Sequence, residues 1–517
     1  MPVPGLPGEP VLGPPAEPGS RSPARELSSR LAASIVFLTS AAVLVLEILA
    51  GRLLAPYVGV SLETYTGIIG TVLGGIAVGT WWGGRMADRV DPRRTLGPLL
   101  VVGGALALFA VPAVSTFGAA GLGTGPVAIV ILASIGFFAP AAVLSAVSPT
   151  VVKLQLSHLA ETGSVVGRLS ALGTAGAIAG TFITGFVLVA ALPSRPVVLA
   201  IGGSLVAGGL ALWARLARPQ GAPPPVGGVL LALTAAATTA LLPVPCQVES
   251  AYFCARVVAD PDRPTGRTLF LDTLRHSYVD LADPAYLEFS YAQVVGDVVD
   301  ATWPEDRPLR ALHVGGGGFS LPRYLRATRP GSYSRVLELD ATLPLIGEQQ
   351  LGLVTGPDLE VVIGDARLTL KGEPDGTYDL VVGDAFGGRA VPWHLTTVEF
   401  LEDVRRTLTP DGLYVMNLID YPPLGFARAE VATLRGVFRH VALIAPRAQA
   451  AGEAGCNFVL FASDAPLDVD GIAAQNARRG GGDAILSTEA ELDGFVGGAT
   501  ILTDDFAPVD QLISPAS

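Results

Sequence analysis

Residues 309–318 read LRALHVGGGG, a short apolar run that leads directly into four glycines. An apolar run of this length, bounded by a turn signal, predicts a buried strand. Glycines between a strand and a helix let the backbone approach a nucleotide closely at the helix N-terminus. With a helix expected from about Phe319, this stretch predicts the opening strand, turn and helix of a nucleotide-binding α/β domain.

Further short apolar runs follow and alternate with amphipathic stretches, which predicts a parallel sheet with crossover helices. The expected strands are 309–314, 334–340, 359–363, 378–382 and 412–417. Such a doubly wound, Rossmann-like sheet binds its ligand at the carboxyl ends of its strands.

Acidic residues stand at the ends of three of these strands. Glu338 lies 23 residues after the first glycine, where an acid accepts hydrogen bonds from ribose hydroxyls. Asp365 and Ala366 follow the third strand, Asp384 follows the fourth, and Asp340 is expected to cap the next helix. Each acid alone is more often a loop residue or a helix cap. Together, in this order, the strand ends predict a site for an adenosyl-type ligand.

The first 245 residues have a different character. Seven apolar segments lie at about 31–50, 64–83, 97–118, 124–148, 168–191, 196–214 and 226–243. Most reach the roughly 20 residues that cross a bilayer, which predicts a multi-pass α-helical membrane bundle in the cell membrane. Gly and Ala recur at spacings of four, as in 73–79 and 173–180, so that helices can pack closely. Residues 1–24, rich in Pro and Gly, are expected to form a disordered tail.

Charge is distributed unevenly along the chain. Residues 1–245 carry 8 acidic and 13 basic side chains, whereas the remainder carries 38 acidic and 21 basic side chains. The acidic second half would repel nucleic acid, so no nucleic-acid partner is expected. In the first half, eleven basic residues lie in the tail and alternate connections, and only Arg52 and Arg195 lie in the others. The positive-inside rule therefore predicts a cytoplasmic N-terminus.

An odd number of spans would place the soluble half outside the cytoplasm. The deciding segment is Val226–Pro243, which either spans or lies re-entrant and returns the chain to the cytoplasm. No Arg or Lys lies between Arg218 and Arg256 to hold its far end inside, so we expect seven spans and an extracytoplasmic soluble half. Cys246 and Cys254 follow Val226–Pro243, and the spacing fits either a disulfide or two free thiols. No zinc spacing is present, so no metal site is expected. Glu47, at the end of the first span, is expected to pair with Arg52.

The chain resembles the bacterial fusions of a transporter-like helical bundle to a spermidine-synthase-like (polyamine aminopropyltransferase) domain, whose Rossmann-like fold is of the class I methyltransferase type. The motifs that carry the resemblance are 46–56 and 173–185 in the first half, and 269–272, the glycine turn, 338–340, 364–366, 378–384 and 502–505 in the second. Residues 83–89 are similar to the loop between the second and third helices of major-facilitator transporters. Seven spans fall short of that family's twelve, so a complete transporter is not expected.

The resemblance implies four parts in the chain. These are the tail (1–24), a transmembrane helical domain (25–245), a small β-rich region that covers the site (246–305) and a spermidine-synthase-like Rossmann domain (306–517).

The resemblance also implies a role for each strand-end residue in binding an S-adenosylmethionine-type nucleoside, either S-adenosylmethionine or its decarboxylated form. Glu338 would bind the ribose, and Asp365 and Ala366 would bind the adenine. The methionine-derived portion would lie against Gly315, Gly316 and Gly317. Asp384 would orient and deprotonate the attacking amine, because an ammonium has no lone pair for nucleophilic attack.

The family's pattern is only partly kept. Gly318 stands where the family's glycine turn ends in Asp, and Gly387 stands where a second acid normally follows the catalytic Asp. Leu287 replaces a Gln or His that helps to hold the polyamine, and Phe253 replaces an early Gln that contacts the nucleoside. The nucleoside half of the site is therefore mostly kept, whereas the diamine half is largely lost.

The expected function is that of a membrane-anchored transferase with an adenosylmethionine-derived donor, and aminopropyl transfer to a small-molecule amine is the first possibility. An adenosylmethionine-dependent methyltransferase is the second, because it needs only the nucleoside site. A non-catalytic nucleoside- or polyamine-binding protein and a transport-associated membrane protein are the alternatives that are not enzymes. The residues leave the acceptor and the oligomeric state open.

Overall fold

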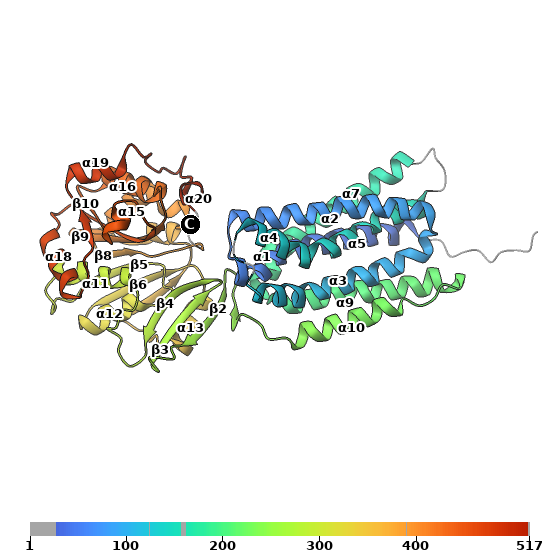
Figure 1. Cartoon of the computed structure of the whole chain (residues 1–517), viewed down its shortest axis with the longest axis horizontal. Coiled ribbons are helices and arrows are strands. Elements are labelled where there is room, and N and C mark those ends of the chain that lie inside the picture. The colour runs from blue at the N-terminus through green and yellow to red at the C-terminus, as the bar shows by residue number, and fades with distance from the viewer. Residues whose placement is uncertain (1–26, 122, 124, 157–161, 389, 515–517) are drawn as a thin grey trace, which may run out of the picture.

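The computed structural model describes residues 27–121, 123, 125–156, 162–388 and 390–514. The chain is elongated, with a bundle of long helices at one end and an α/β domain at the other (Figure 1). The tail expected over residues 1–24 lies outside the described residues.

Within the described residues, the bundle has six helices that are long and apolar enough to cross a membrane. They are α1 (Ser29–Val58), α2 (Leu62–Arg89), α3 (Pro92–Ala119), the run α4–α6 (Pro126–Gln155), the run α7–α8 (Thr162–Ala191) and the run α9–η5 (Ser194–Gln220). A seventh apolar helix, α10 (Val226–Leu241), has 16 residues. At 1.5 Å per residue it is about 24 Å long, shorter than the roughly 30 Å apolar core of a bilayer. All seven predicted segments are therefore helical, and the seventh is the shortest.

Glycines bring several pairs of bundle helices into backbone contact, among them the pairs that include α2 and α7. On α2, an added Cβ at Gly75 would lie 2.8 Å from the Phe138 carbonyl oxygen, and the contact continues one turn at a time at Gly79 and Gly83. On α7, an added Cβ at Gly180 would lie 2.6 Å from a carbonyl oxygen of α1. We call these two contacts the glycine seams. A spacing of four residues aligns the glycines on one helix face, as the sequence pattern predicted.

The connection between α2 and α3 lies at the end of the bundle away from the α/β domain (Figure 1). Lys153 forms an ion pair of 2.8 Å with Asp88, and Arg94 donates a hydrogen bond of 3.3 Å to Gln220. The connections with most of the basic residues therefore gather at this end.

Arg52 lies at the other end of the bundle, beside the α/β domain. Its guanidinium forms an ion pair of 3.0 Å with Glu249 and donates to the carbonyl oxygens of Val189 (3.1 Å) and Ser250 (2.6 Å). The predicted pairing of Arg52 with Glu47 is wrong, because Glu249, in the first short strand after the bundle, reaches Arg52 and supplies its counter-charge.

A four-stranded antiparallel sheet follows the bundle. Its strands, in spatial order, are β1 (Val248–Glu249), β2 (Cys254–Ala259), β3 (Gly266–Leu271) and β4 (Leu274–Asp280). Cys246 and Cys254 form a disulfide that joins the linker to β2.

The large sheet has eight strands in the order β12-β10-β11-β9-β8-β5-β6-β7. The strands are β5 (Arg310–Val314), β6 (Tyr333–Glu338), β7 (Leu359–Ile363), β8 (Tyr378–Gly383), β9 (Leu408–Asp420), β10 (His440–Ala445), β11 (Cys456–Ser463) and β12 (Ala484–Leu486). Strands β5 to β9 are parallel, and the chain order reverses on the two sides of β5. This doubly wound order brings the ends of β5, β6 and β8 together at one edge.

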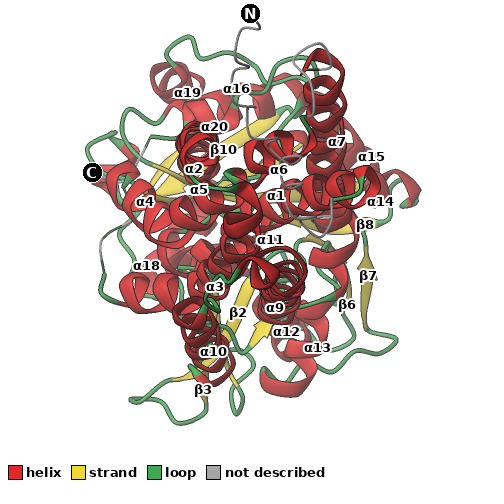
Figure 2. Cartoon of the chain, turned by 90° about the vertical axis from the view of Figure 1, so that its right-hand side faces the viewer, coloured by secondary structure: helices red, strands yellow, loops and turns green. Residues whose placement is uncertain are grey.

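Helices cover both faces of this sheet (Figure 2). The helices of the domain are α11 (Ser290–Thr302), α12 (Ser320–Thr328), α13 (Thr342–Gln350), α14 (Ala366–Thr369), α15 (Val398–Thr407), α16 (Gly425–Val437), α18 (Val469–Arg478) and α19 (Glu489–Val496). Alternate residues of β9 enter different cores: Val415 packs with α11 and α12, whereas Met416 packs with α15 and α16. A strand buried on both faces is uniformly apolar, which explains the apolar runs in the sequence.

Candidate functional site

The glycine turn lies between β5 and α12. Gly315 and Gly317 have φ values of +95° and +51°, which side-chain-bearing residues rarely adopt. An added Cβ on Gly315 would lie 2.5 Å from the Asp384 carbonyl oxygen, so the turn packs directly against the residue that follows β8. The predicted nucleoside turn and the predicted catalytic acid therefore share one edge of the sheet.

Glu338 joins the end of β6 to this turn. Its carboxylate accepts hydrogen bonds from the backbone N–H groups of Gly316 (2.8 Å) and Asp340 (2.8 Å), and the residue is only 5% exposed. Burial raises the pKa of Glu338, while these backbone donors oppose the rise. Asp340 in turn accepts from the Thr342 N–H at the start of α13, although the N-cap of this helix is Ala341, one residue after the predicted position.

Asp365 caps the short helix α14. Its carboxylate accepts a hydrogen bond from the Arg367 N–H (2.8 Å), and Nε2 of His394 lies 3.6 Å from it. Ala366, the first residue of α14, is buried. The carboxylate of Asp365 is half-buried and partly accessible at the strand-end edge.

Asp384 is held by two side chains from distant parts of the chain. Asn417 Nδ2 donates to one carboxylate oxygen at 2.8 Å, and the Tyr291 hydroxyl donates to the other at 3.0 Å. Asn417 is itself fixed by Asn457, whose amide donates to its oxygen at 3.0 Å. Burial raises the pKa of Asp384 to about 6, and the two hydrogen bonds limit the rise. The site therefore holds an oriented carboxylate that takes up a proton near neutral pH.

Tyr291 and Asn417 were not among the residues singled out in the sequence. Tyr291 begins α11, before the first strand of the large sheet, and Asn417 lies inside β9. Asn417 carried one visible signal: it is an amide in an otherwise apolar run, at the carboxyl end of the fifth predicted strand. Tyr291 carried no local signal, because only the folded chain brings α11 to the end of β8.

The small sheet contributes a third unforeseen group. The Gly318 N–H donates to the Ser277 hydroxyl at 2.9 Å, and His276 Nδ1 lies 3.1 Å from the same oxygen. Burial lowers the pKa of His276 to about 4, so its imidazole is neutral at physiological pH. Strand β4 therefore covers the glycine turn with uncharged polar groups.

Comparisons with known proteins place relatives in this half of the chain. A polyamine aminopropyltransferase of Vibrio vulnificus is 34% identical over 134 residues, which cover 26% of this chain and 44% of that protein. The C-terminal half is spermidine-synthase-like. The human eEF1A lysine and N-terminal methyltransferase is 30% identical over 142 residues, which cover 25% of this chain and 20% of the relative.

A probable spermidine synthase structure from Corynebacterium glutamicum matches with 29% identity and a TM-score of 0.47, over 50% of this chain and 95% of that one. The chain spans about half the length of the curated aminopropyltransferases it matches, 44% and 53% in two cases. A scan against protein-family models found no match.

Two of the positions at which this half differs from the family's pattern, Gly318 and Gly387, have different surroundings. An added Cβ at Gly318 would lie 2.6 Å from Ser277 Cβ, so the absence of a side chain lets β4 approach the turn. Gly387 is exposed, and an added Cβ there would be no closer than 3.9 Å to Pro392. The first position excludes a side chain, whereas the second leaves room for one.

The other two departures are also explained by the fold. Leu287 is buried in the core beside α11, and the tyrosine before it, Tyr286, donates to Glu288 rather than to Asp384. The tyrosine that donates a hydrogen bond to Asp384 is Tyr291. Phe253 lines a cavity beside the bundle.

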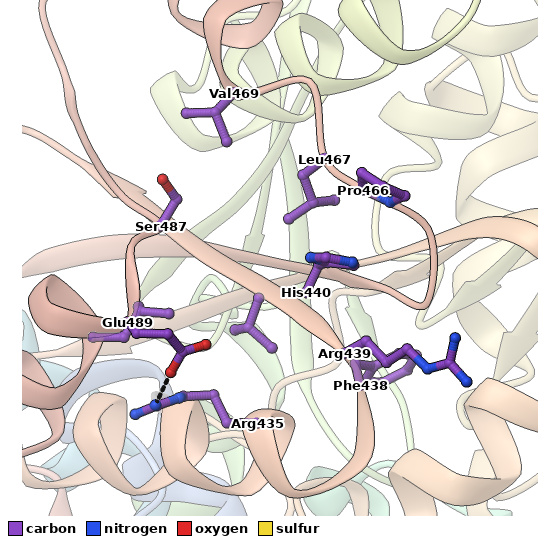
Figure 3. A pocket seen from close by; sticks show the side chains of 11 residues that line it. Arg435, Phe438, Arg439, His440, Pro466, Leu467, Val469, Ser487 and Glu489 are labelled. Atoms are coloured by element: carbon purple, nitrogen blue, oxygen red, sulfur yellow. Dashed lines mark hydrogen bonds and ion pairs between the residues drawn. The ribbon is translucent and has the colours of Figure 1, made fainter.

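Two other pockets of the spermidine-synthase-like half lie at the opposite edge of the sheet. One has a volume of about 330 Å³ and includes the ion pair of Arg435 with Glu489, 2.5 Å apart, and His440 at the start of β10 (Figure 3). Since β9 and β10 are both antiparallel to β11, they are parallel to each other, and His440 lies at their amino ends. The other pocket is lined by Gly376 and Leu408, at the amino ends of β8 and β9. Neither pocket is lined by Asp384.

Proposed function

We propose that this protein is a transferase that uses an adenosylmethionine-derived donor, with Asp384 as the base that activates an amine acceptor. The observation that carries the proposal is the position of Asp384, whose backbone packs against the glycine turn and whose carboxylate is held by Tyr291 and Asn417. The sequence similarity of this half to polyamine aminopropyltransferases supports aminopropyl transfer as the first candidate reaction.

The proposed chemistry needs one proton acceptor and one neutral leaving group. Asp384 takes a proton from the ammonium, which frees the nitrogen lone pair. The nitrogen then attacks the carbon bound to the donor's sulfonium. A C–N bond forms, and the C–S bond breaks with its electron pair moving to sulfur, which leaves as a neutral thioether. Glycines without side chains would let the nucleoside approach the backbone of the turn, and Glu338 and Asp365 would contact its ribose and adenine.

A methyltransferase is the second candidate. Gly387 leaves the edge beside Asp384 without the second acid that would hold a diamine, and a methyltransferase relative matches a similar share of the chain. A nucleoside- or polyamine-binding protein without catalysis, or a transport-associated protein, would keep the pocket but show no turnover.

A donor panel distinguishes these candidates. The full-length protein, purified in detergent, is incubated with adenosylmethionine or with its decarboxylated form, together with a set of amines, and products are followed by mass spectrometry. We expect methylthioadenosine from the decarboxylated donor. S-adenosylhomocysteine from adenosylmethionine would favour the methyltransferase, and binding without either product would favour the binding protein.

We further propose that the helical bundle lies in the cell membrane, with the N-terminus in the cytoplasm. Six helices of sufficient length support the first part, and the gathering of basic connections at one end of the bundle supports the second. Seven passages would then put the α/β domain on the outer side. The disulfide between Cys246 and Cys254 supports that side, because disulfides persist in oxidising compartments.

A further inference from the structure

A cavity of about 300 Å³ lies where the bundle meets the small sheet. Its walls come from α1, α2, the end of the α7–α8 run, the linker and the β3–β4 turn. A volume near 300 Å³ is at the lower end of small-molecule sites and about ten times the share of one water molecule. The cavity is therefore large enough for a small organic molecule and too large for a bare metal ion.

Two carboxylates that form no ion pair within the described part of the chain line this cavity. Asp272, on the β3–β4 turn, is only 6% exposed, and its carboxylate accepts a hydrogen bond from the Cys254 N–H at 2.9 Å. Glu47, on α1, makes no hydrogen bond or ion pair among the described residues. Burial raises the pKa of Asp272 to about 6, since no cation lies beside it. The carboxylate is still mainly ionised at physiological pH.

The basic group in the cavity wall is already engaged. Arg52 is paired with Glu249 and with three backbone carbonyl oxygens, so this pair contributes no net charge. Glu47 and Asp272 therefore leave the cavity with an excess of negative charge. A buried carboxylate without a partner is costly, and an entering cation would remove that cost.

Aromatic rings complete the lining. Tyr65 on α2 lies against Gly51 of α1, where an added Cβ would be 3.1 Å from the ring, and Phe253, between β1 and β2, also lines the cavity. Ring faces attract organic cations, and they favour alkylammonium groups, which are less strongly hydrated than sodium or magnesium ions. Carboxylates and aromatic rings in one cavity are the groups that bind an organic cation.

We propose that this cavity binds a small organic ammonium ion, through the carboxylates of Glu47 and Asp272 and the ring of Tyr65. The site is separate from the Asp384 carboxylate and does not depend on the proposed transferase reaction. It is nonetheless a neighbour of the catalytic loop: the Val60 carbonyl oxygen in the cavity wall would lie 3.0 Å from a Cβ added to Gly388, four residues after Asp384. An ion bound in this cavity would therefore lie between the bundle and the α/β domain.

The proposal can be tested by equilibrium binding to the full-length protein in lipid nanodiscs, with radiolabelled 1,4-diaminobutane as the probe. We expect saturable binding to the wild type, weakened about tenfold or more by Glu47→Gln and by Asp272→Asn. Glu63→Gln is the matched control, because Glu63 is an exposed acid on α2 outside the cavity, and it should leave binding unchanged. Glu47→Gln is the stronger test, since that carboxylate has no partner whose loss would disturb folding.

The remaining arms separate this cavity from other sites. Binding that persists in Asp384→Asn and is lost in Glu47→Gln assigns the probe to the cavity. Loss in Asp384→Asn alone places the probe at the strand-end edge and overturns the proposal. Equal displacement by butylammonium and by sodium at the same concentration would also overturn it, because it would indicate a site for any cation. A failure of the donor panel leaves all of these outcomes unchanged.

Discussion

The Tyr291 hydroxyl donates a hydrogen bond to the Asp384 carboxylate across 93 positions of sequence, at 3.0 Å. Tyr291 stands at the start of α11 and Asp384 directly after β8, so the contact fixes the helix that precedes the large sheet against the site at its edge. Burial alone would leave Asp384 protonated over a wider pH range, and the tyrosine opposes that effect.

Replacing Asp384 with Asn should abolish transferase turnover while leaving nucleoside binding nearly intact. The amide is close to isosteric with the carboxylate but takes up no proton near neutral pH. Turnover and nucleoside affinity should be measured on the same preparation. Activity within about tenfold of the wild type, an effect of roughly 1.4 kcal/mol, would show that Asp384 is not the base.

The pH dependence should follow Asp384. Its pKa is raised to about 6 by burial, and a base must be ionised, so kcat/KM should rise with pH to a half-maximum near 6 and then level off. Tyr291→Phe removes a hydrogen bond that favours the ionised form, so the rise should move to higher pH. Tyr286→Phe is the matched control, because Tyr286 bonds to Glu288. An unchanged profile in Tyr291→Phe would contradict the role of this contact.

Glu338→Ala should weaken nucleoside binding by about 1–3 kcal/mol, the usual loss when a charged hydrogen-bond partner is removed. Isothermal calorimetry with adenosylmethionine, its decarboxylated form and methylthioadenosine measures the effect. Glu348→Ala, an exposed substitution on α13, serves as the control. Absence of heat with all three nucleosides in the wild type would reject the nucleoside site.

Two glycine substitutions should differ in stability. Gly318→Asp forces a Cβ to within 2.6 Å of Ser277 Cβ, and overpacking of this kind costs about 1–3 kcal/mol. Gly387→Asp meets nothing closer than 3.9 Å and should be nearly neutral. Thermal unfolding of the two variants compares them directly. Equal melting temperatures would mean that β4 does not lie against the turn.

Cysteine labelling tests on which side the α/β domain lies. With an external domain, an impermeant maleimide should label Cys246 and Cys254 in intact cells only after reduction of their disulfide. Cys456→Ala removes the remaining thiol, so that the signal comes from this pair. Labelling only after lysis would place the domain in the cytoplasm. External labelling would exclude a donor confined to the cytoplasm, so the experiment also bears on the proposed reaction.

Local patterns in the sequence were sufficient to predict the five parallel strands of the α/β domain, β5 to β9. The strand expected at 359–363 is β7 to the residue, and the strand expected at 412–417 lies inside the longer β9. The central parallel strands leave a strong signal because both of their faces are apolar, whereas β7, at the edge of the sheet, is only partly buried. The antiparallel strands β10 to β12 were not predicted, since their pairing depends on partners distant in sequence.

The site could be predicted only where it follows strand ends. Gly315, Glu338 and Asp384 meet at one edge because the strand order brings them there, and their spacing along the chain was enough to anticipate it. Side chains that contact these residues from other elements could not be predicted from local sequence patterns. Tyr291, on α11, donates a hydrogen bond to Asp384, and Arg52 pairs with Glu249 rather than with Glu47. Both contacts arise only from tertiary packing.

The glycine seams limit how the bundle can change shape. Along α2, three successive turns touch the backbone of the facing helix, at Gly75, Gly79 and Gly83. Two backbones so close cannot slide along each other, because a small axial shift would bring a carbonyl oxygen into steric overlap with the facing helix. In any conformational change of the bundle, the two helices joined by a glycine seam must therefore move together as one rigid body. Rotation is then confined to the contacts between such pairs.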